Sequence, residues 1–130
     1  MPKPKFLNCP SVPQFQNLNQ ATIVDNKVLL AGMVGMDTEM NIMNGLEAQA
    51  HKTFSNMKTV LEFCGSDLQH IISLNIYLDN SLTGPEVDRF NEIYREYFPV
   101  KEERPIRCCV QVKLADILVE IVNTKAFLKD

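Results

Sequence analysis

The stretch PIRCCVQV (Pro105–Val112), followed after a short polar turn by VEIVNTKAF (Val119–Phe127), decides the fold of this chain. Residues 106–112 alternate in character, which predicts a β-strand. Its apolar side comprises Ile106, Cys108, Val110 and Val112, and its other side comprises Arg107, Cys109 and Gln111. Residues 119–127 predict the last strand. Because the turn around residues 113–116 is short, the two strands are expected to be antiparallel neighbours.

Two regions upstream also predict strands. Ala21–Val24 and Lys27–Ala31 are short aliphatic runs, and the Asp25-Asn26 pair between them is typical of a hairpin turn. Residues 71–78 predict a further strand with one apolar and one mixed face. The apolar face comprises Ile72, Leu74, Ile76 and Leu78. A mixed face indicates a sheet covered by helices on one side only, whose other side meets water or another subunit.

Two segments predict helices. Apolar residues over positions 46–63 recur at steps of three and four, and Gly65 suits the left-handed position just after a helix end. Thr83-Gly-Pro-Glu86 has the form of a capping box, so a second helix is expected to begin there and to stop before Pro99. Its apolar stripe comprises Val87, Phe90, Tyr94 and Tyr97, and Asn91 lies on the same face.

The predicted order of elements is β-β-α-β-α-β-β, an α+β fold with a mixed sheet and both helices on one face. A chain of 130 residues has the size of one domain, which we place at residues 1–130. Residues 1–15 hold four prolines and show little periodicity. They predict an extended N-terminal arm.

Composition argues against several classes of protein. The net charge is −3 and no run of Lys and Arg occurs, which argues against nucleic-acid binding. No metal motif is present, and the four cysteines have no metal-site spacing, so we interpret them as free thiols in a reducing compartment. Neither a signal peptide nor an apolar run of membrane-spanning length is found, and we expect a cytoplasmic protein. His51 and His70 have no partner at a telling spacing and are interpreted as structural or surface residues.

Arg107 and Glu120 are the best candidates for a chemical centre. Arg107 interrupts an otherwise apolar or thiol-bearing strand, and its guanidinium suits a ligand carboxylate through two parallel N–H bonds. Glu120 lies among aliphatic neighbours, which should raise its pKa and suit it to activate a water. The alternative is an Arg107–Glu120 ion pair across strands, or two solvent-facing charges. Asn91 also has two interpretations: its side chain could bind a ligand or cap a neighbouring backbone group.

Several blocks of the sequence resemble the RidA/YjgF family. They are Cys64–Asp79 (CGSDLQHIISLNIYLD), Phe90–Tyr94 (FNEIY), Tyr97–Pro99 (YFP), Pro105–Val112 and Val119–Ile121 (VEI). The resemblance implies a chorismate-mutase-like fold and a homotrimer, with the sheets packed into a central barrel and a ligand cleft between subunits. It also implies hydrolysis of reactive enamines or imines, such as 2-aminoacrylate, to 2-oxo acids and ammonia without a cofactor.

The resemblance assigns roles to five residues. Arg107 would bind the substrate carboxylate, Glu120 would orient the attacking water, and Cys109, Asn91 and Gly32 would line the cleft. Two positions depart from the family pattern, because Leu18 and Ala31 replace a tyrosine and a serine. The function that the resemblance favours is an imine deaminase, which the family's terms describe as a 2-iminobutanoate/2-iminopropanoate deaminase. The rivals are a non-catalytic module that binds a small 2-oxo acid, and an endoribonuclease or translation inhibitor.

Overall fold

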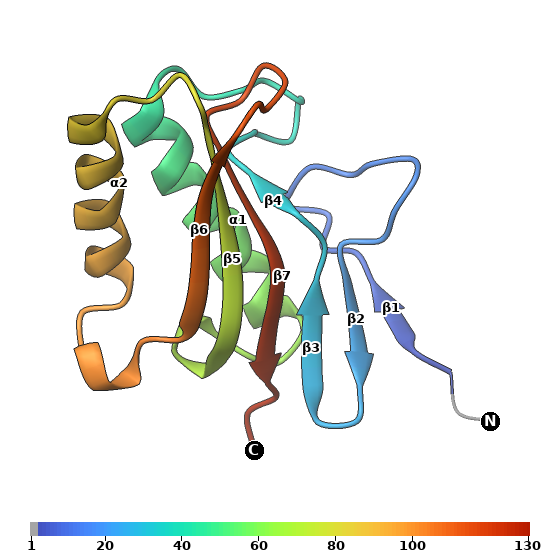
Figure 1. Ribbon diagram of the computed structural model, residues 1–130. Coiled ribbons are helices and arrows are strands. Elements are labelled where there is room, and N and C mark those ends of the chain that lie inside the picture. Colours follow the sequence, from blue (N-terminus) through green and yellow to red (C-terminus); the bar gives the residue numbers. More distant parts are fainter. Residues whose placement is uncertain (1–2) are drawn as a thin grey trace.

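A computed structural model describes residues 3–130 as one mixed sheet with two long helices packed on the same face (Figure 1). The sheet order is β1-β2-β3-β7-β5-β6, and β4 pairs with β7 outside this path. The strands are β1 (Lys5–Leu7), β2 (Ala21–Val24), β3 (Lys27–Leu30), β4 (Met33–Val34), β5 (Ile71–Asp79), β6 (Ile106–Val112) and β7 (Val119–Phe127). The long helices are α1 (Leu46–Phe63) and α2 (Gly84–Tyr97), with short 3-10 helices at Leu68–His70 and Lys101–Glu103. The predicted α+β architecture is confirmed, with β1 and β4 as additional short strands.

The N-terminal segment is folded onto the sheet rather than forming a free arm. Lys5–Leu7 pairs antiparallel with β2, and the side chains of Cys9 and Val12 are buried. The buried Gln20 side chain holds this segment, because it accepts from the Cys9 N–H at 2.7 Å and donates to the Cys9 and Pro13 carbonyl oxygens. The predicted arm is therefore extended only along β1, and its first two residues lie outside the described part of the chain.

Both helices begin and end as the sequence predicts. The α2 capping box is complete, since the Thr83 hydroxyl accepts from the Glu86 N–H and the Glu86 carboxylate accepts from the Thr83 N–H. Gly65 follows α1 with φ +93°, a left-handed conformation that favours glycine. The helices pack on each other through an aromatic cluster of Phe54, Phe90, Tyr94, Tyr97 and Phe98. The predicted α2 stripe omitted Ile93, which is fully buried.

Strand β5 lies between β7 and the edge strand β6 and shows one departure from the predicted pattern. Leu74, Ile76 and Leu78 are buried under the helices as expected. The β5–β7 ladder is irregular between Ile71 and Asn75, however, and this changes the alternation. Ile71 is buried and Ile72 only half-buried, so Ile71 takes the place predicted for Ile72.

The predicted pairing of the two C-terminal strands is wrong. Strand β5 lies between them, parallel to β6 and antiparallel to β7. The connection between β6 and β7 is long enough to span two strand spacings, roughly 10 Å. A short connection therefore allows one strand between β6 and β7 and does not require them to be neighbours. The apolar side of β6 also faces away from the helices, where Ile106 is 74% exposed and Val110 is 40% exposed.

Candidate functional site

Arg107 projects from β6, at the edge of the sheet, toward the second half of α2. Its Nη2 donates to Asn91 Oδ1 at 2.7 Å, and the guanidinium carbon lies 4.4 Å from the centre of the Tyr94 ring. Asn91 and Tyr94 are three residues apart on α2 and therefore share a face. In residues 3–130, Arg107 has no carboxylate within ion-pair distance. The guanidinium is thus held in place with donors left over for an anionic ligand.

Cys109 lies on the same face of β6 as Arg107 and packs against the core. Burial raises the pKa of the Cys109 thiol, and the nearby Arg107 charge only partly opposes this effect. The thiol is therefore protonated near neutral pH, which argues against a cysteine nucleophile. Cys108 is exposed on the opposite face, as the alternation along a strand requires.

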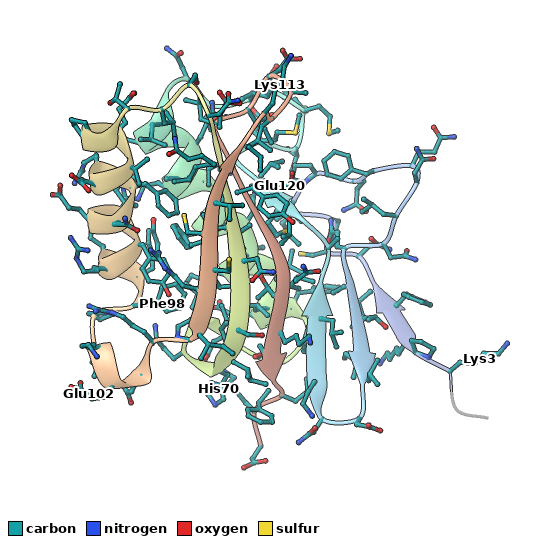
Figure 2. All side chains as sticks on the ribbon, in the orientation of Figure 1. Lys3, His70, Phe98, Glu102, Lys113 and Glu120 are labelled. Atoms are coloured by element: carbon teal, nitrogen blue, oxygen red, sulfur yellow. The ribbon has the colours of Figure 1, made fainter. Side chains whose placement is uncertain are left out.

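Glu120 lies on β7 (Figure 2). There it pairs with Val34 of β4 and Tyr77 of β5. Burial raises the pKa of its carboxyl group, as predicted, because the charged form loses solvation. Its Oε2 occupies the space that a Cβ atom at Gly32 would need. Gly32 can lie against the Glu120 carboxylate because it has no side chain. This contact explains the glycine at position 32, for which the sequence alone offered no reason.

The two predicted catalytic residues lie on opposite faces of the sheet. In the β5 register, Leu74 pairs with Arg107 and Tyr77 pairs with Glu120. Leu74 is buried under the helices, and Tyr77, an odd number of positions further on, points to the opposite face. An Arg107–Glu120 ion pair within one chain is therefore excluded. The structure forms one group from Arg107, Asn91 and Cys109, and a second group from Gly32 and Glu120.

An apolar recess adjoins Gly32. It is lined chiefly by Val12, Phe15, Leu18, Ala31 and Met33, so both positions that depart from the family pattern lie in it. Buried amides support its walls. Gln20 holds the N-terminal segment as described above, and Asn56 of α1 donates to the Val34 and Met36 carbonyl oxygens at 3.0 and 2.9 Å. Sequence analysis missed both amides, whose only signal was a polar residue within an apolar pattern.

The two histidines have partners that their sequence spacing did not reveal. His51 Nδ1 lies 2.6 Å from the Tyr97 hydroxyl, and His70 Nδ1 lies 2.7 Å from Asp67 Oδ1. Neither histidine contacts Arg107 or Glu120 in the hydrogen bonds of the described chain. Within residues 3–130, no three His, Cys, Asp or Glu side chains gather as a metal site would require. No described helix has the length and apolar character needed to cross a membrane.

Fold and site together define a class: a small α+β protein whose mixed sheet carries an arginine held by α2 and a half-buried glutamate beside a glycine. The model of the family described as "Endoribonuclease L-PSP" matches residues 11–127. The chain belongs to this family, which confirms the resemblance found in the sequence and the chorismate-mutase-like fold.

Named relatives and solved structures agree with this assignment. A 3-aminoacrylate deaminase RutC of Acinetobacter baylyi is 32% identical over 127 residues, covering 95% of this chain and 97% of that protein. A 2-iminobutanoate/2-iminopropanoate deaminase of Dermatophagoides farinae is 30% identical over 97 residues, covering 72% and 73%. A hypothetical protein from Giardia lamblia has a TM-score of 0.96 at 46% identity, over 98% of this chain and 100% of that chain. RidA from Psychrobacter has a TM-score of 0.84 at 26% identity, over 95% and 99%.

Proposed function

We propose that this protein hydrolyses reactive enamine and imine intermediates to 2-oxo acids and ammonia. The observation that carries the proposal is the Arg107 guanidinium, fixed by Asn91 and Tyr94 and without a carboxylate partner in the described chain. Two relatives of this chain are named as deaminases of such compounds. An arginine with free paired donors is the group best suited to a small carboxylate.

The chemistry asks little of the protein. An enamine first tautomerises to its imine, water adds to the imine carbon, and the resulting carbinolamine expels ammonia as the C=O bond forms. In this scheme Arg107 binds the substrate carboxylate and fixes the position of the imine carbon. The Glu120 carboxylate accepts a proton from the attacking water, a role that suits a carboxyl group whose pKa is raised by burial and which is therefore a stronger base.

Because Arg107 and Glu120 lie on opposite faces, we propose that a complete site needs two copies of the chain. The Gly32–Glu120 group of one copy would face the Arg107–Asn91 group of its neighbour. Support comes from the face of the sheet without helices, where apolar side chains are exposed: Ile106 at 74%, Val110 at 40% and Phe127 at 43%. Apolar surface on one sheet face indicates a partner, and a closed homotrimer of identical chains satisfies this requirement.

A second candidate is a module that binds a small 2-oxo acid without catalysing its formation. The recess beside Gly32 favours it, because Leu18 and Ala31 offer no hydroxyl to water or substrate. Each missing hydrogen bond is worth about 1 kcal/mol. The endoribonuclease alternative lacks comparable support, since the two histidines are engaged by Tyr97 and Asp67 rather than facing the arginine.

The deciding experiment couples the purified protein to a threonine dehydratase and follows the release of 2-oxobutanoate from its imine. We expect release faster than in a dehydratase-only control, and no acceleration by the Arg107→Ala variant. Arg89→Ala is the matched control, because Arg89 also lies on the surface but pairs with Glu47. Acceleration by Arg107→Ala at the parental rate contradicts the proposed mechanism. Arg107-dependent binding of 2-oxobutanoate without acceleration supports the binding module instead.

A further inference from the structure

A hollow of about 450 Å³ opens beside Arg107, lined by the end of α2, the turn after it and the start of β6. Arg95, Lys101, Arg104 and Arg107 line it, together with Asn91 and Tyr94. All four side chains that carry a formal charge in this lining are cationic, although the chain as a whole has a net charge of −3. The volume is within the range of about 300–1,000 Å³ that is typical of small-molecule sites.

These cations are not neutralised within the described chain. No ion pair within residues 3–130 includes any of the four. Glu102 and Glu103 follow Lys101 in the same turn, but both are exposed and neither lines the hollow; Figure 2 shows Glu102 at the outer edge of this turn. Gathering like charges in one concave surface costs Coulomb energy, which an anionic ligand would recover.

The end of α2 accounts for only part of this arrangement. Arg104 Nε donates to the Phe98 carbonyl oxygen at 2.7 Å, and its Nη2 donates to the Pro99 carbonyl oxygen at 3.4 Å. Cations at a helix C-terminus are stabilised by the helix dipole. That effect explains the position of Arg104, but it does not explain why Lys101 and Arg107, from two other elements, line the same hollow.

We propose that this hollow binds a second anionic group of the ligand, so that the substrate is a 2-imino acid whose side chain ends in a carboxylate. This inference rests on the proposed function. One carboxylate pairs with Arg107, and the second lies against Arg95, Lys101 and the remaining donors of Arg104. Inorganic phosphate is the rival ligand, because arginine side chains bind phosphate as well as carboxylate.

The test compares the affinities of three probes by isothermal titration calorimetry: 2-oxoglutarate, 2-oxobutanoate and inorganic phosphate. We expect the parent protein to bind 2-oxoglutarate about tenfold more tightly than 2-oxobutanoate, the effect of two exposed ion pairs. The double variant Arg95→Ala/Lys101→Ala is expected to bring this ratio close to one, and Arg107→Ala to weaken both acids. Arg104 is left intact in this test because it also holds the helix end. Arg89→Ala, which removes one positive charge from α2 outside the hollow, should keep the ratio.

Three results would overturn the assignment. They are equal affinity of the parent protein for both acids, loss of the preference in Arg89→Ala, and phosphate binding as tight as that of 2-oxoglutarate. Circular dichroism of each variant verifies folding. Failure of the proposed function gives a different result. A preference for the diacid without imine hydrolysis would reject the deaminase function and support the second anion-binding subsite. Equally fast hydrolysis of mono- and dicarboxylic imines would reject the subsite and support the deaminase function.

Discussion

The two faces of the central sheet carry different halves of the candidate site. On the helix-covered face, Arg107 is fixed by a hydrogen bond and a stacked ring from α2, and its surroundings are polar and cationic. On the open face, Glu120 lies against Gly32 at a site where burial raises its pKa. The first half is suited to bind an anion. The second half contains a carboxyl group whose pKa is raised. Neither half contains the groups for the whole reaction.

The largest effect expected from this division is complementation between two inactive variants. Arg107→Ala lacks the carboxylate anchor and Glu120→Ala lacks the proton acceptor, so each is expected to lose about 10–100-fold of the activity, the range for removing a charged hydrogen-bonding group. If each site combines two copies, mixed assemblies restore some complete sites. Random assembly of an equal mixture, after unfolding and refolding together, should make about one site in four complete.

The measurement is imine hydrolysis in the mixture, compared with each variant refolded alone. Mixing the variants without refolding is the control, since preformed assemblies should exchange little. Activity of the refolded mixture no greater than the mean of the separate variants would show that one chain supplies the entire site. The proposed pairing of faces between copies would then be abandoned.

Gly32 and Gly35 differ in what a side chain would meet, so substitutions at the two positions separate an effect on function from an effect on stability. A methyl group at Gly35 would lie 2.7 Å from the Cα atom of Gln49 and 2.5 Å from its carbonyl oxygen, and a helix backbone cannot move aside. A methyl group at Gly32 would meet the mobile end of Glu120 instead. We expect Gly35→Ala to lower the free energy of unfolding by about 2–3 kcal/mol and Gly32→Ala by less than about 1 kcal/mol.

Urea unfolding followed by circular dichroism measures this difference. We expect Gly32→Ala to lose more activity than Gly35→Ala, the reverse of their order in stability, because Gly32→Ala displaces the Glu120 carboxylate while the protein stays folded. Equal destabilisation by the two substitutions would mean that the Glu120 side chain is held as rigidly as the helix backbone, contrary to its assigned role.

The raised pKa of Glu120 has a consequence for stability. Below the ordinary carboxyl pKa of 4.5, Glu120 is protonated in both the folded and unfolded states, and burial carries no ionisation penalty. As the pH rises above 4.5, the unfolded state ionises first, so the contribution of Glu120 to the free energy of unfolding falls until the folded carboxyl group has ionised as well. Glu120→Gln should therefore melt at a higher temperature than the parent at pH 7 and at the same temperature below pH 4.

Melting temperatures across this pH range test the sign of the effect, with Glu62→Gln as the control. Glu62 is an exposed glutamate on α1 that pairs with Lys58 and is remote from β7 in the sequence. A Glu120→Gln variant less stable than the parent at pH 7 would show that the ionised carboxylate is stabilised by partners in the assembled protein. The open face would then be more polar in solution than in the single chain.

Periodicity and capping predicted the helices and most strands correctly, because these depend on neighbours within a few residues. The α2 capping box and the left-handed Gly65 are examples, since both depend on interactions within a few residues of the helix end. The placement of β7 beside β6 failed because strand order depends on contacts between distant segments. Alternation does place Arg107 opposite Ile106 on its strand, but no local signal says which side the helices cover. The candidate residues were therefore identifiable, whereas their division between two faces was not.

The smallest expected effect concerns the Tyr94 hydroxyl, which is buried and has no hydrogen-bond partner in the described chain. The ring of Tyr94 packs against the Arg107 guanidinium, whereas burial of its hydroxyl without a hydrogen bond destabilises the single chain. Tyr94→Phe keeps the ring, so it should raise the free energy of unfolding by up to about 1 kcal/mol and change kcat/KM less than about threefold. Thermal unfolding and the coupled assay measure both quantities. A tenfold loss of kcat/KM with unchanged stability would show that the hydroxyl donates to the substrate, and the polar half of the site would then extend beneath Arg107.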